Sequence, residues 1–529
     1  MFVGYRAMRR GVVAAVAVLL AALIAACSAQ ATIRYQVSLS RPVEHRFGIG
    51  MTIPDVRGSV TVQMPAWDGL YQIRDFAHHL SEMRASDGSG SELAITRLDK
   101  QTWRIEGDGE VRLQYATFWD ETGPFGTQLD AEHAFLNLAV VLCYVPGRLA
   151  EDTVVRFDQL PQGWRVAVQL PKAAGGDAAD TAYAAADYGA LVDAPVEIGR
   201  FEEVQFRAGG RPIRAVIHGD SVDRTRLVST LTAIVEYQTR LMGGAPFDEY
   251  LFIYHVGRRF GGGGMEHSNS TAISADSGAA LLNVSAHEFF HLWNVKRIRP
   301  QSLEPVDRTR EMWTPALWFA EGVSNTYASY TLVRTGLWSK AEFLADLGEQ
   351  ITTLQARPAH RWQSAEESSL ATWLDKYPLY ERPEFSISYY NKGQLLGLGL
   401  DLVIRDATDN RASLDDVLRK LNQQYAQQKR FYPDSKGIQA AAEEVIRDQR
   451  TDGRADLTDF FRRYVAGTDE LPLAHWLSLA GLTLRVSGER HNVEEMSQTS
   501  ERQRRTLAGL LSGGVTEYAL PAASGTGGR

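Results

Sequence analysis

The sequence predicts an α+β protein with more than one domain, in which a β-rich N-terminal domain precedes a mainly helical domain. The chain has 529 residues, of which 44% are hydrophobic and 23% charged, a composition typical of globular domains. Between about residues 31 and 220 the apolar segments are short and separated by turn residues. Beyond residue 220 apolar residues recur at helical spacing over longer stretches.

The N-terminal domain is predicted to span residues 31–220 and to consist of strands. Segments such as "SVTVQM" and "TVVRFDQLPQGWRVAVQL" are rich in β-branched and aromatic residues. Near the end of this region Val204 and Phe206 alternate with Gln205 and Arg207. Such alternation is typical of a strand with one buried face.

The second domain is predicted to span residues 221–484. "DRTRLVSTLTAIVEYQTRL" indicates a helix and "EYLFIYHV" a strand, and helices follow to about residue 467. Ser413 with Asp416 is a capping signature at the start of one of these helices. Residues 485–529 are expected to form a polar helix and a disordered tail.

Residues 1–26 have the layout of a signal peptide, which predicts export to the bacterial cell envelope or periplasm. Three arginines precede an apolar run at residues 11–26, and this run is shorter than the roughly 18 to 20 residues of a membrane-spanning helix. The run ends at Cys27 in a context that resembles the bacterial lipobox. We therefore expect Cys27 to be lipidated and to anchor the chain to a membrane. Cleavage after Ala29 is the alternative.

Charge and cysteine content exclude some classes of function. The formal net charge is −8 and the pI is about 5.9, so a polyanionic partner such as nucleic acid is not expected. The chain has only two cysteines, Cys27 and Cys143. This count rules out a disulfide framework and a cysteine zinc site.

The stretch "SAHEFFHLWNVKRIRP" at residues 285–300 contains the strongest chemical signal in the chain. His287 and His291 are four residues apart, so in a helix their imidazoles lie one above the other and can bind one ion. Glu288 lies about 100° around the helix, where its carboxylate can accept a proton from water activated by the metal. Two histidines that align by chance are the alternative.

A catalytic zinc needs a third protein ligand and an open position. The helix predicted next, at residues 314–336, carries Glu321 within the apolar stretch "ALWFAEGV". A buried carboxylate without a partner is very costly, so we predict that Glu321 binds the metal. A buried ion pair between Glu321 and a Lys or Arg is the alternative.

Four motifs together resemble the glycyl aminopeptidase family of zinc metallopeptidases: "HEFFHLWNVKRIRP", "WFAEGVSNTY", "GGMEHSNST" and "SYYNKGQLLGLGLDLVIR". The resemblance implies a β-sandwich-like N-terminal domain, a thermolysin-like catalytic domain and one Zn²⁺. It also implies an aminopeptidase that removes small N-terminal residues, Gly or Ala, from peptides with a free N-terminus. The family usually ends in a PDZ domain, and we expect this chain to lack an intact one, because the residues after Leu484 are too few.

The resemblance also implies roles for residues near the metal. Tyr390 matches the tyrosine of a Tyr-x-Lys-Gly motif whose phenol stabilises the transition state, and Tyr389 is its rival. Glu266 matches the glutamate that binds the substrate's α-ammonium group. The preceding Gly263, Gly264 and Met265 would let an extended peptide lie along the backbone.

The main hypothesis is a zinc aminopeptidase in which Glu288 is the general base and Tyr390 supports the oxyanion. An endopeptidase that uses the same metal, with Glu266 uninvolved, is a second hypothesis. A non-catalytic binding protein anchored in the envelope is a third.

Overall fold

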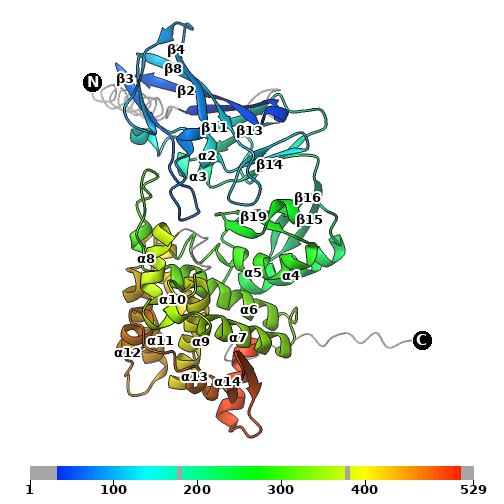
Figure 1. Cartoon of the computed structure of the whole chain (residues 1–529), viewed down its shortest axis with the longest axis vertical. Coiled ribbons are helices and arrows are strands. Elements are labelled where there is room, and N and C mark those ends of the chain that lie inside the picture. The colour runs from blue at the N-terminus through cyan, green and yellow to red at the C-terminus, as the bar shows by residue number, and fades with distance from the viewer. Residues whose placement is uncertain (1–31, 175–180, 376–381, 514–529) are drawn as a thin grey trace, which may run out of the picture.

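The computed structural model describes residues 32–174, 181–375 and 382–513. The predicted signal peptide, Cys27 and the end of the predicted tail lie outside these residues. A β-rich region up to about residue 275 precedes a mainly helical region (Figure 1), so the predicted fold class is confirmed. Among the described residues, no helix combines the length and the apolar character needed to cross a membrane.

The N-terminal domain is built around a seven-stranded sheet with the order β13-β11-β1-β2-β8-β4-β5. Its strands are β1 (Ile33–Arg41), β2 (Arg46–Val56), β4 (Leu80–Asp87), β5 (Glu92–Leu93), β8 (Gly109–Phe118), β11 (Thr153–Asp158) and β13 (Ala182–Ala185). A three-stranded sheet contains β3 (Ser59–Gln63), β6 (Ile95–Arg97) and β7 (Thr102–Glu106).

Strand β2 shows why this sequence forms a sheet with a core. Phe47, Ile49, Met51 and Ile53 alternate with less buried residues, and each of the four is at most 2% exposed. Since side chains alternate across a strand, these four lie on one face. Burial of each such side chain contributes about 1.5–3 kcal/mol.

Two further sheets lie against each other where the N-terminal domain meets the rest of the chain. The four-stranded sheet has the order β12-β14-β10-β9, with β9 (Gln128–Leu129), β10 (His133–Leu136), β12 (Arg165–Ala167) and β14 (Val196–Gly199). The five-stranded sheet has the order β15-β16-β17-β19-β18, with β15 (Glu202–Ala208), β16 (Arg211–Gly219), β17 (Tyr250–Val256), β18 (Gly263–Glu266) and β19 (Ser270–Ala275). Phe135 and Ala167 from the first sheet pack against Leu251 and Ile253 from the second.

The five-stranded sheet crosses the domain boundary that the sequence predicts at residue 220. Strands β15 and β16, which the sequence analysis places in the N-terminal domain, pair with the later strands through the parallel pairing of β16 with β17. Parallel neighbours are separated in sequence by a crossover, here helix α4 (Arg224–Leu241), so their pairing leaves no local signal.

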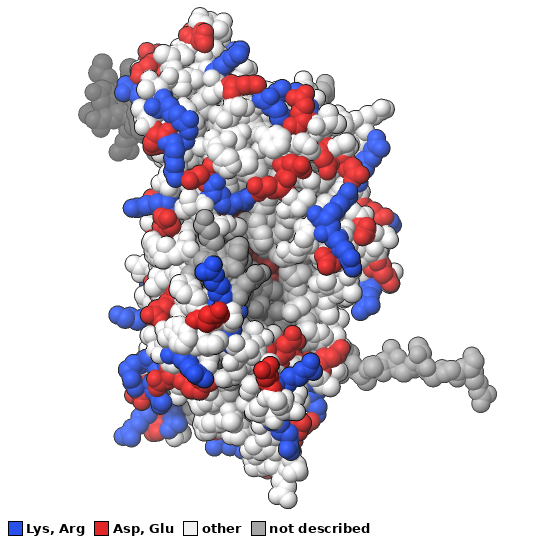
Figure 2. Space-filling model, viewed as in Figure 1, with Lys and Arg blue, Asp and Glu red and all other residues white. Residues whose placement is uncertain are grey.

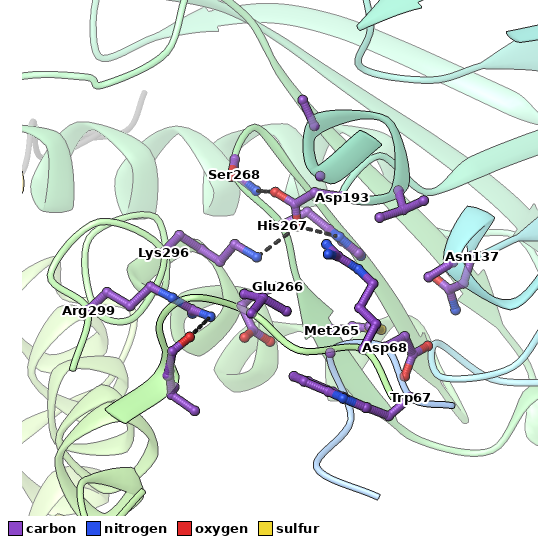
Figure 3. Close-up of a pocket in the computed structure, with 18 of the residues that line it drawn as sticks. Trp67, Asp68, Asn137, Asp193, Met265, Glu266, His267, Ser268, Lys296 and Arg299 are labelled. Atoms are coloured by element: carbon purple, nitrogen blue, oxygen red, sulfur yellow. Dashed lines mark hydrogen bonds and ion pairs between the residues drawn. The ribbon is translucent and has the colours of Figure 1, made fainter. Parts of the chain in front are cut away.

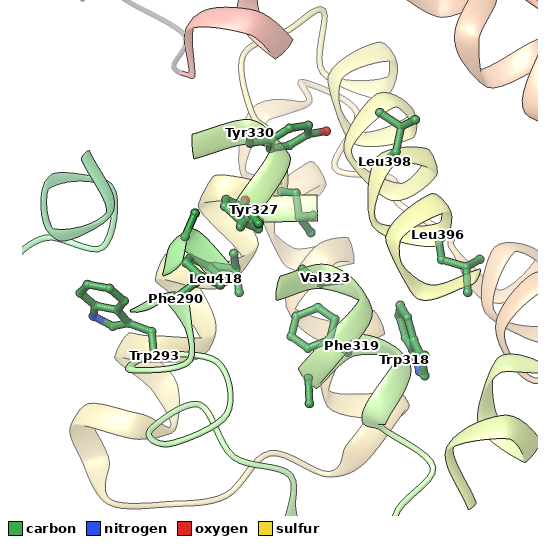
Figure 4. Close-up of a cluster of buried hydrophobic side chains, with 14 of the residues drawn as sticks. Phe290, Trp293, Trp318, Phe319, Val323, Tyr327, Tyr330, Leu396, Leu398 and Leu418 are labelled. Atoms are coloured by element: carbon green, nitrogen blue, oxygen red, sulfur yellow. The ribbon is translucent and has the colours of Figure 1, made fainter. Parts of the chain in front are cut away.

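The helical region begins with α4 and α5 (Leu281–Phe290), which contact strands of the five-stranded sheet. The remaining helices are α6 (Ser324–Arg334), α7 (Lys340–Gln355), α8 (Ala365–Asp375), α9 (Tyr389–Ala407), α10 (Leu414–Gln424), α11 (Asp434–Gln449), α12 (Thr458–Phe460), α13 (Leu473–Leu479) and α14 (Glu501–Ser512). Their shared core includes Phe290 stacked on Tyr327, with ring centroids 4.5 Å apart (Figure 4).

Glycines let α9 approach the segment that precedes α6. That segment, η8 (Trp318–Val323), is a π-helical turn. A Cβ on Gly322 would lie 2.4 Å from the Cα of Gly393 in α9. Side chains larger than hydrogen would therefore separate the two helices, which carry Glu321 and Tyr390.

Two local details differ from the sequence analysis. The helix predicted over residues 314–336 begins as the π-helical turn. The polar helix expected from residue 485 is present only as α14. A hairpin of β20 (Leu482–Ser487) and β21 (Arg490–Glu495) comes before it, since the Gly488-Glu489 turn joins two short β-type runs.

Candidate metal centre and cleft

His287, His291 and Glu321 converge at the end of α5. The Nε2 atoms of the two histidines are 2.8 Å apart, and Glu321 Oε2 lies 3.3 Å from His287 Nε2 and 3.2 Å from His291 Nε2. All three side chains are buried. The structure thus brings together the three residues that the sequence proposed as ligands, although their role as ligands stays a prediction.

The donor set fits a zinc ion. A tetrahedral ion with bonds of about 2.0–2.1 Å needs donor atoms about 3.3 Å apart, close to the spacings found here. His291 Nδ1 donates to the carbonyl oxygen of Asn294 at 2.6 Å, which leaves Nε2 as the ring nitrogen that faces His287 and Glu321. Burial alone would raise the pKa of Glu321, but His291 and His287 hold this pKa well below its ordinary value. The carboxylate is therefore ionised and suited to a cation.

Asn294 connects the metal helix to the segment that carries Glu321. Its side-chain nitrogen donates to the carbonyl oxygen of Phe319 at 2.8 Å, while its own carbonyl accepts from His291. Ser324 Oγ also donates to the Asn294 carbonyl, at 3.1 Å. Which groups Asn294 contacts depends on how the two segments pack.

Glu288 is buried beside the three convergent side chains. Its Oε2 has no hydrogen-bond partner among the described residues. Burial raises the pKa of Glu288 well above its ordinary value, and the negative charges of Glu266 and Glu321 act in the same direction. A carboxylate with a raised pKa is well matched to accepting a proton near neutral pH.

The structure separates the two adjacent tyrosines at the start of α9. Tyr390 lines the cleft next to the metal centre, and its ring centroid lies 6.1 Å from that of His287. Tyr389 is fully buried, and its hydroxyl shares a hydrogen bond of 3.2 Å with Thr372. Of the two candidates, Tyr390 is therefore the one that faces the cleft.

Strand β18 forms one wall of the cleft and contains Gly263, Gly264, Met265 and Glu266. A Cβ on Gly264 would lie 2.3 Å from Glu288 Oε1 and 2.5 Å from Glu288 Cγ, so a larger residue here would have to displace the Glu288 side chain. Carboxylate or imidazole atoms of Glu266, Glu288 and His291 lie within 4.8 Å of one another. The residues that the sequence grouped as substrate-binding thus border the metal centre.

The cleft has a volume of about 500 Å³ and is also lined by Leu70, Tyr71 and Phe125 from the N-terminal domain. The space-filling view shows a hollow between the two halves of the molecule (Figure 2). Nothing in the sequence indicated that the N-terminal domain contributes to the cleft. These residues are distant in sequence from the metal motif and meet it only when the domains pack.

Behind β18 lies a second cavity, of about 430 Å³, which Glu266 also lines. Asp193 from the N-terminal domain pairs there with Lys296 Nζ at 2.7 Å and with His267 Nδ1 at 3.3 Å (Figure 3). Burial alone would raise the pKa of Asp193, but Lys296 and His267 hold it well below its ordinary value. Asp193 therefore links the N-terminal domain to the segment that follows α5 and to the residue that follows β18.

Two family models match this chain. The model of the Peptidase M61 N-terminal domain matches residues 34–200, and the model of the M61 glycyl aminopeptidase matches residues 280–396. Together they cover more than half of the chain. Among curated protein sequences, no significant match was found.

Solved structures with similar folds include an aminopeptidase N family protein from Idiomarina loihiensis. It is 26% identical with a TM-score of 0.79, over 86% of this chain and 79% of that chain. A mutant M1 zinc metallopeptidase from Deinococcus radiodurans, bound to a Tyr-Ser-Ala substrate, is 16% identical with a TM-score of 0.51. That match covers 84% of this chain and 95% of the other, and it shows similarity of fold.

Family models thus match this chain on both sides of the cleft. That cleft contains the paired histidines, Glu288 and Glu321. The protein is a zinc metallopeptidase. Within that class it belongs to the M61 glycyl aminopeptidase family.

Proposed function

We propose that the protein is an aminopeptidase that removes small N-terminal residues, Gly or Ala, from peptides. The observation that carries the proposal is the position of Glu266. Its side chain makes no hydrogen bond or ion pair with any residue that the structure describes, although it borders Glu288 and His291. An ammonium group at the end of a peptide would supply the missing positive partner.

When bound, zinc supplies a Lewis acid that activates water and polarises the scissile carbonyl group. His287, His291 and Glu321 hold the ion. Glu288 accepts a proton from the attacking water at a carboxylate oxygen and passes it to the nitrogen of the leaving peptide. The Tyr390 hydroxyl donates a hydrogen bond to the carbonyl oxygen, where negative charge develops.

A preference for small first residues is supported by the crowded wall of the cleft. Met265, Tyr71 and Phe125 line the same cleft as Glu266, and Gly264 brings the backbone of β18 against Glu288. A peptide whose ammonium group binds Glu266 therefore has its first side chain among bulky neighbours. One additional methylene that does not fit changes specificity by about 1–3 kcal/mol.

Matched peptides test the proposal. We expect hydrolysis of peptides with an N-terminal Gly or Ala, and a large loss of kcat/KM when the same peptides are N-acetylated. Glu266→Gln should lower kcat/KM for the unblocked peptides by roughly 30-fold or more, since removing one member of a buried charge pair costs about 2–5 kcal/mol. Equal cleavage of blocked and unblocked peptides would instead establish an endopeptidase.

We further propose that the chain is exported and anchored to a membrane through Cys27. The arginines before the apolar run at residues 11–26 and the lipobox-like sequence support this proposal. Mass spectrometry of the mature N-terminus tests it. The expected product starts at Cys27 and carries acyl chains, whereas a product that starts after Ala29 contradicts anchoring.

A further inference from the structure

A second cluster of ligand-type side chains lies between the two sheets at the domain junction. It contains His133 from β10, Glu197 from β14 and His255 from β17, and each is at most 1% exposed. One donor atom from each residue lies within 4.8 Å of the other two. None of these residues lines the cleft of the metal centre.

The alternation of side chains along the strands explains why these residues meet. On β14, Val196 and Ile198 face the core of the N-terminal domain, so Glu197 between them faces the opposite way. On β17, Leu251 and Ile253 face the four-stranded sheet, and His255 continues that face. Glu197 and His255 thus project from two sheets into the same layer.

The contacts within the cluster are short. His133 Nδ1 lies 3.0 Å from Glu197 Oε1, and His255 Nε2 lies 2.9 Å from Glu197 Oε2. One carboxylate therefore faces a ring nitrogen from each sheet. These spacings are similar to those between Glu321 and the two histidines of the catalytic centre, which are 3.3 and 3.2 Å.

The contact of His133 Nε2 with Gln128 indicates where the proton of the His133 ring lies. His133 Nε2 lies 3.2 Å from Gln128 Oε1, and Gln128 Nε2 donates to Asp120 Oδ1 at 3.1 Å. The bond to Asp120 orients the amide so that its oxygen faces His133, which places a proton on His133 Nε2. Nδ1 is then the His133 atom that faces Glu197, and with a metal ion between them its lone pair and the Glu197 carboxylate would both face the cation.

We propose that His133, Glu197 and His255 bind a second divalent metal ion, which joins the N-terminal domain to the five-stranded sheet. Two imidazoles and a carboxylate suit zinc or a related transition-metal ion. Gln128 fits the role of the acceptor that fixes the tautomer of a metal-binding histidine. The strands hold the three donors in place before the ion binds.

The position of this site gives it a structural role. The ring of Phe260 packs against the rings of His133 and His255, with centroid distances of 5.9 and 5.4 Å, and two residues separate Phe260 from the start of β18. The ion would therefore hold the start of the strand that carries Glu266. It would act on the catalytic cleft through the position of this strand and not by contact with substrate.

His218 lies beside the cluster but is not assigned as a ligand. Its ring stacks on that of His133 with centroids 3.8 Å apart and an interplanar angle of 9°. Lone pairs of parallel stacked rings do not converge on one point.

The alternative to a metal site is a cluster held by hydrogen bonds alone. In that arrangement His133 carries a proton on both nitrogens, and His133 and His255 each donate a hydrogen bond to Glu197.

Metal counting distinguishes the two arrangements. The full, untagged protein is loaded with zinc, dialysed against metal-free buffer and analysed by atomic emission. We expect about two equivalents of zinc in the native protein and about one in His291→Ala, which alters only the catalytic centre. Glu197→Gln should also retain about one equivalent, and the control His79→Ala, which alters a histidine outside both clusters, should retain about two.

A native protein with about one equivalent of zinc, together with a His291→Ala variant that binds none, overturns the proposal. So does a folded Glu197→Gln variant that keeps both equivalents. The native protein and His291→Ala both keep the cluster of His133, Glu197 and His255 intact. Their zinc counts therefore test the second site even if Glu197→Gln does not fold. None of these counts depends on which peptides the protein cleaves.

Discussion

The candidate metal centre and the cluster at the domain junction contain the same residue types but arrange them differently. His287 and His291 lie one helical turn apart, and Glu288 and the cleft adjoin them. His133, Glu197 and His255 come from three strands of two sheets, and the layer between the sheets encloses them. The first arrangement is open to a substrate, whereas the second can only hold parts of the protein together.

The difference shows how far ligand spacing can be used as a signal. A helix brings residues i and i+4 onto one face, so a pair of ligands in a helix is visible in the sequence. Strands bring residues together through pairing and sheet packing, which combine positions that are far apart. The sequence analysis accordingly found the first cluster and missed the second.

Because only the metal centre adjoins the cleft, substitutions there should affect turnover more than substitutions in the cluster at the domain junction. Among them we expect Glu288→Gln to have the largest effect. The variant should lose kcat by roughly 10³–10⁴-fold, because an amide cannot accept the proton, and it should keep its zinc. Steady-state kinetics with a glycyl peptide, combined with zinc analysis, measures both. Activity within about tenfold of the native protein would remove Glu288 from the role of general base.

Tyr390→Phe should have the next largest effect. We expect kcat to fall by about 10²–10³-fold with little change in KM, because the hydroxyl acts mainly on the charge of the transition state. Tyr389→Phe is the matched control, since the Tyr389 hydroxyl bonds Thr372 instead of facing the cleft. Equal losses in the two variants would show that packing, and not the oxyanion, explains the effect.

Glu197→Gln should affect stability more than chemistry. The substitution leaves a buried imidazole nitrogen without its carboxylate, which costs about 2–3 kcal/mol in the free energy of unfolding. Urea titration measures this loss. The rate per folded molecule should fall far less than in Glu288→Gln, and a fall of the same size would mean that the junction takes part in catalysis.

Asp193→Asn should have the smallest effect and a distinct pH dependence. Because Lys296 and His267 depress the pKa of Asp193, its ionised form stabilises the folded state above the ordinary pKa of aspartate. That stabilisation is lost as the pH falls below about 4. We expect a loss of about 1–2 kcal/mol near neutral pH, with a difference between variant and native protein that shrinks in acid. A constant difference across this range would exclude the ion pairs as its source.

The sequence alone determined the fold class, the metal-binding motif and the candidate residues around it. Strand and helix periods depend on local side-chain patterning, so the β-rich and helical regions were predictable. The spacing of His287 and His291 is local in the same way. Glu321 was a candidate ligand because a carboxylate in an apolar helix needs a cation, and the structure places it beside both histidines.

Only the tertiary structure decided which of these residues face one another and what the junction contains. The parallel pairing of β16 with β17 placed part of the predicted N-terminal domain in the sheet of the catalytic half. The packing of α9 against the π-helical turn turned Tyr390, rather than Tyr389, toward the cleft. The meeting of Glu197 with His133 and His255 depends on two sheets stacking face to face. Such contacts join distant positions whose sequence separation has no fixed period, so a single sequence does not reveal them.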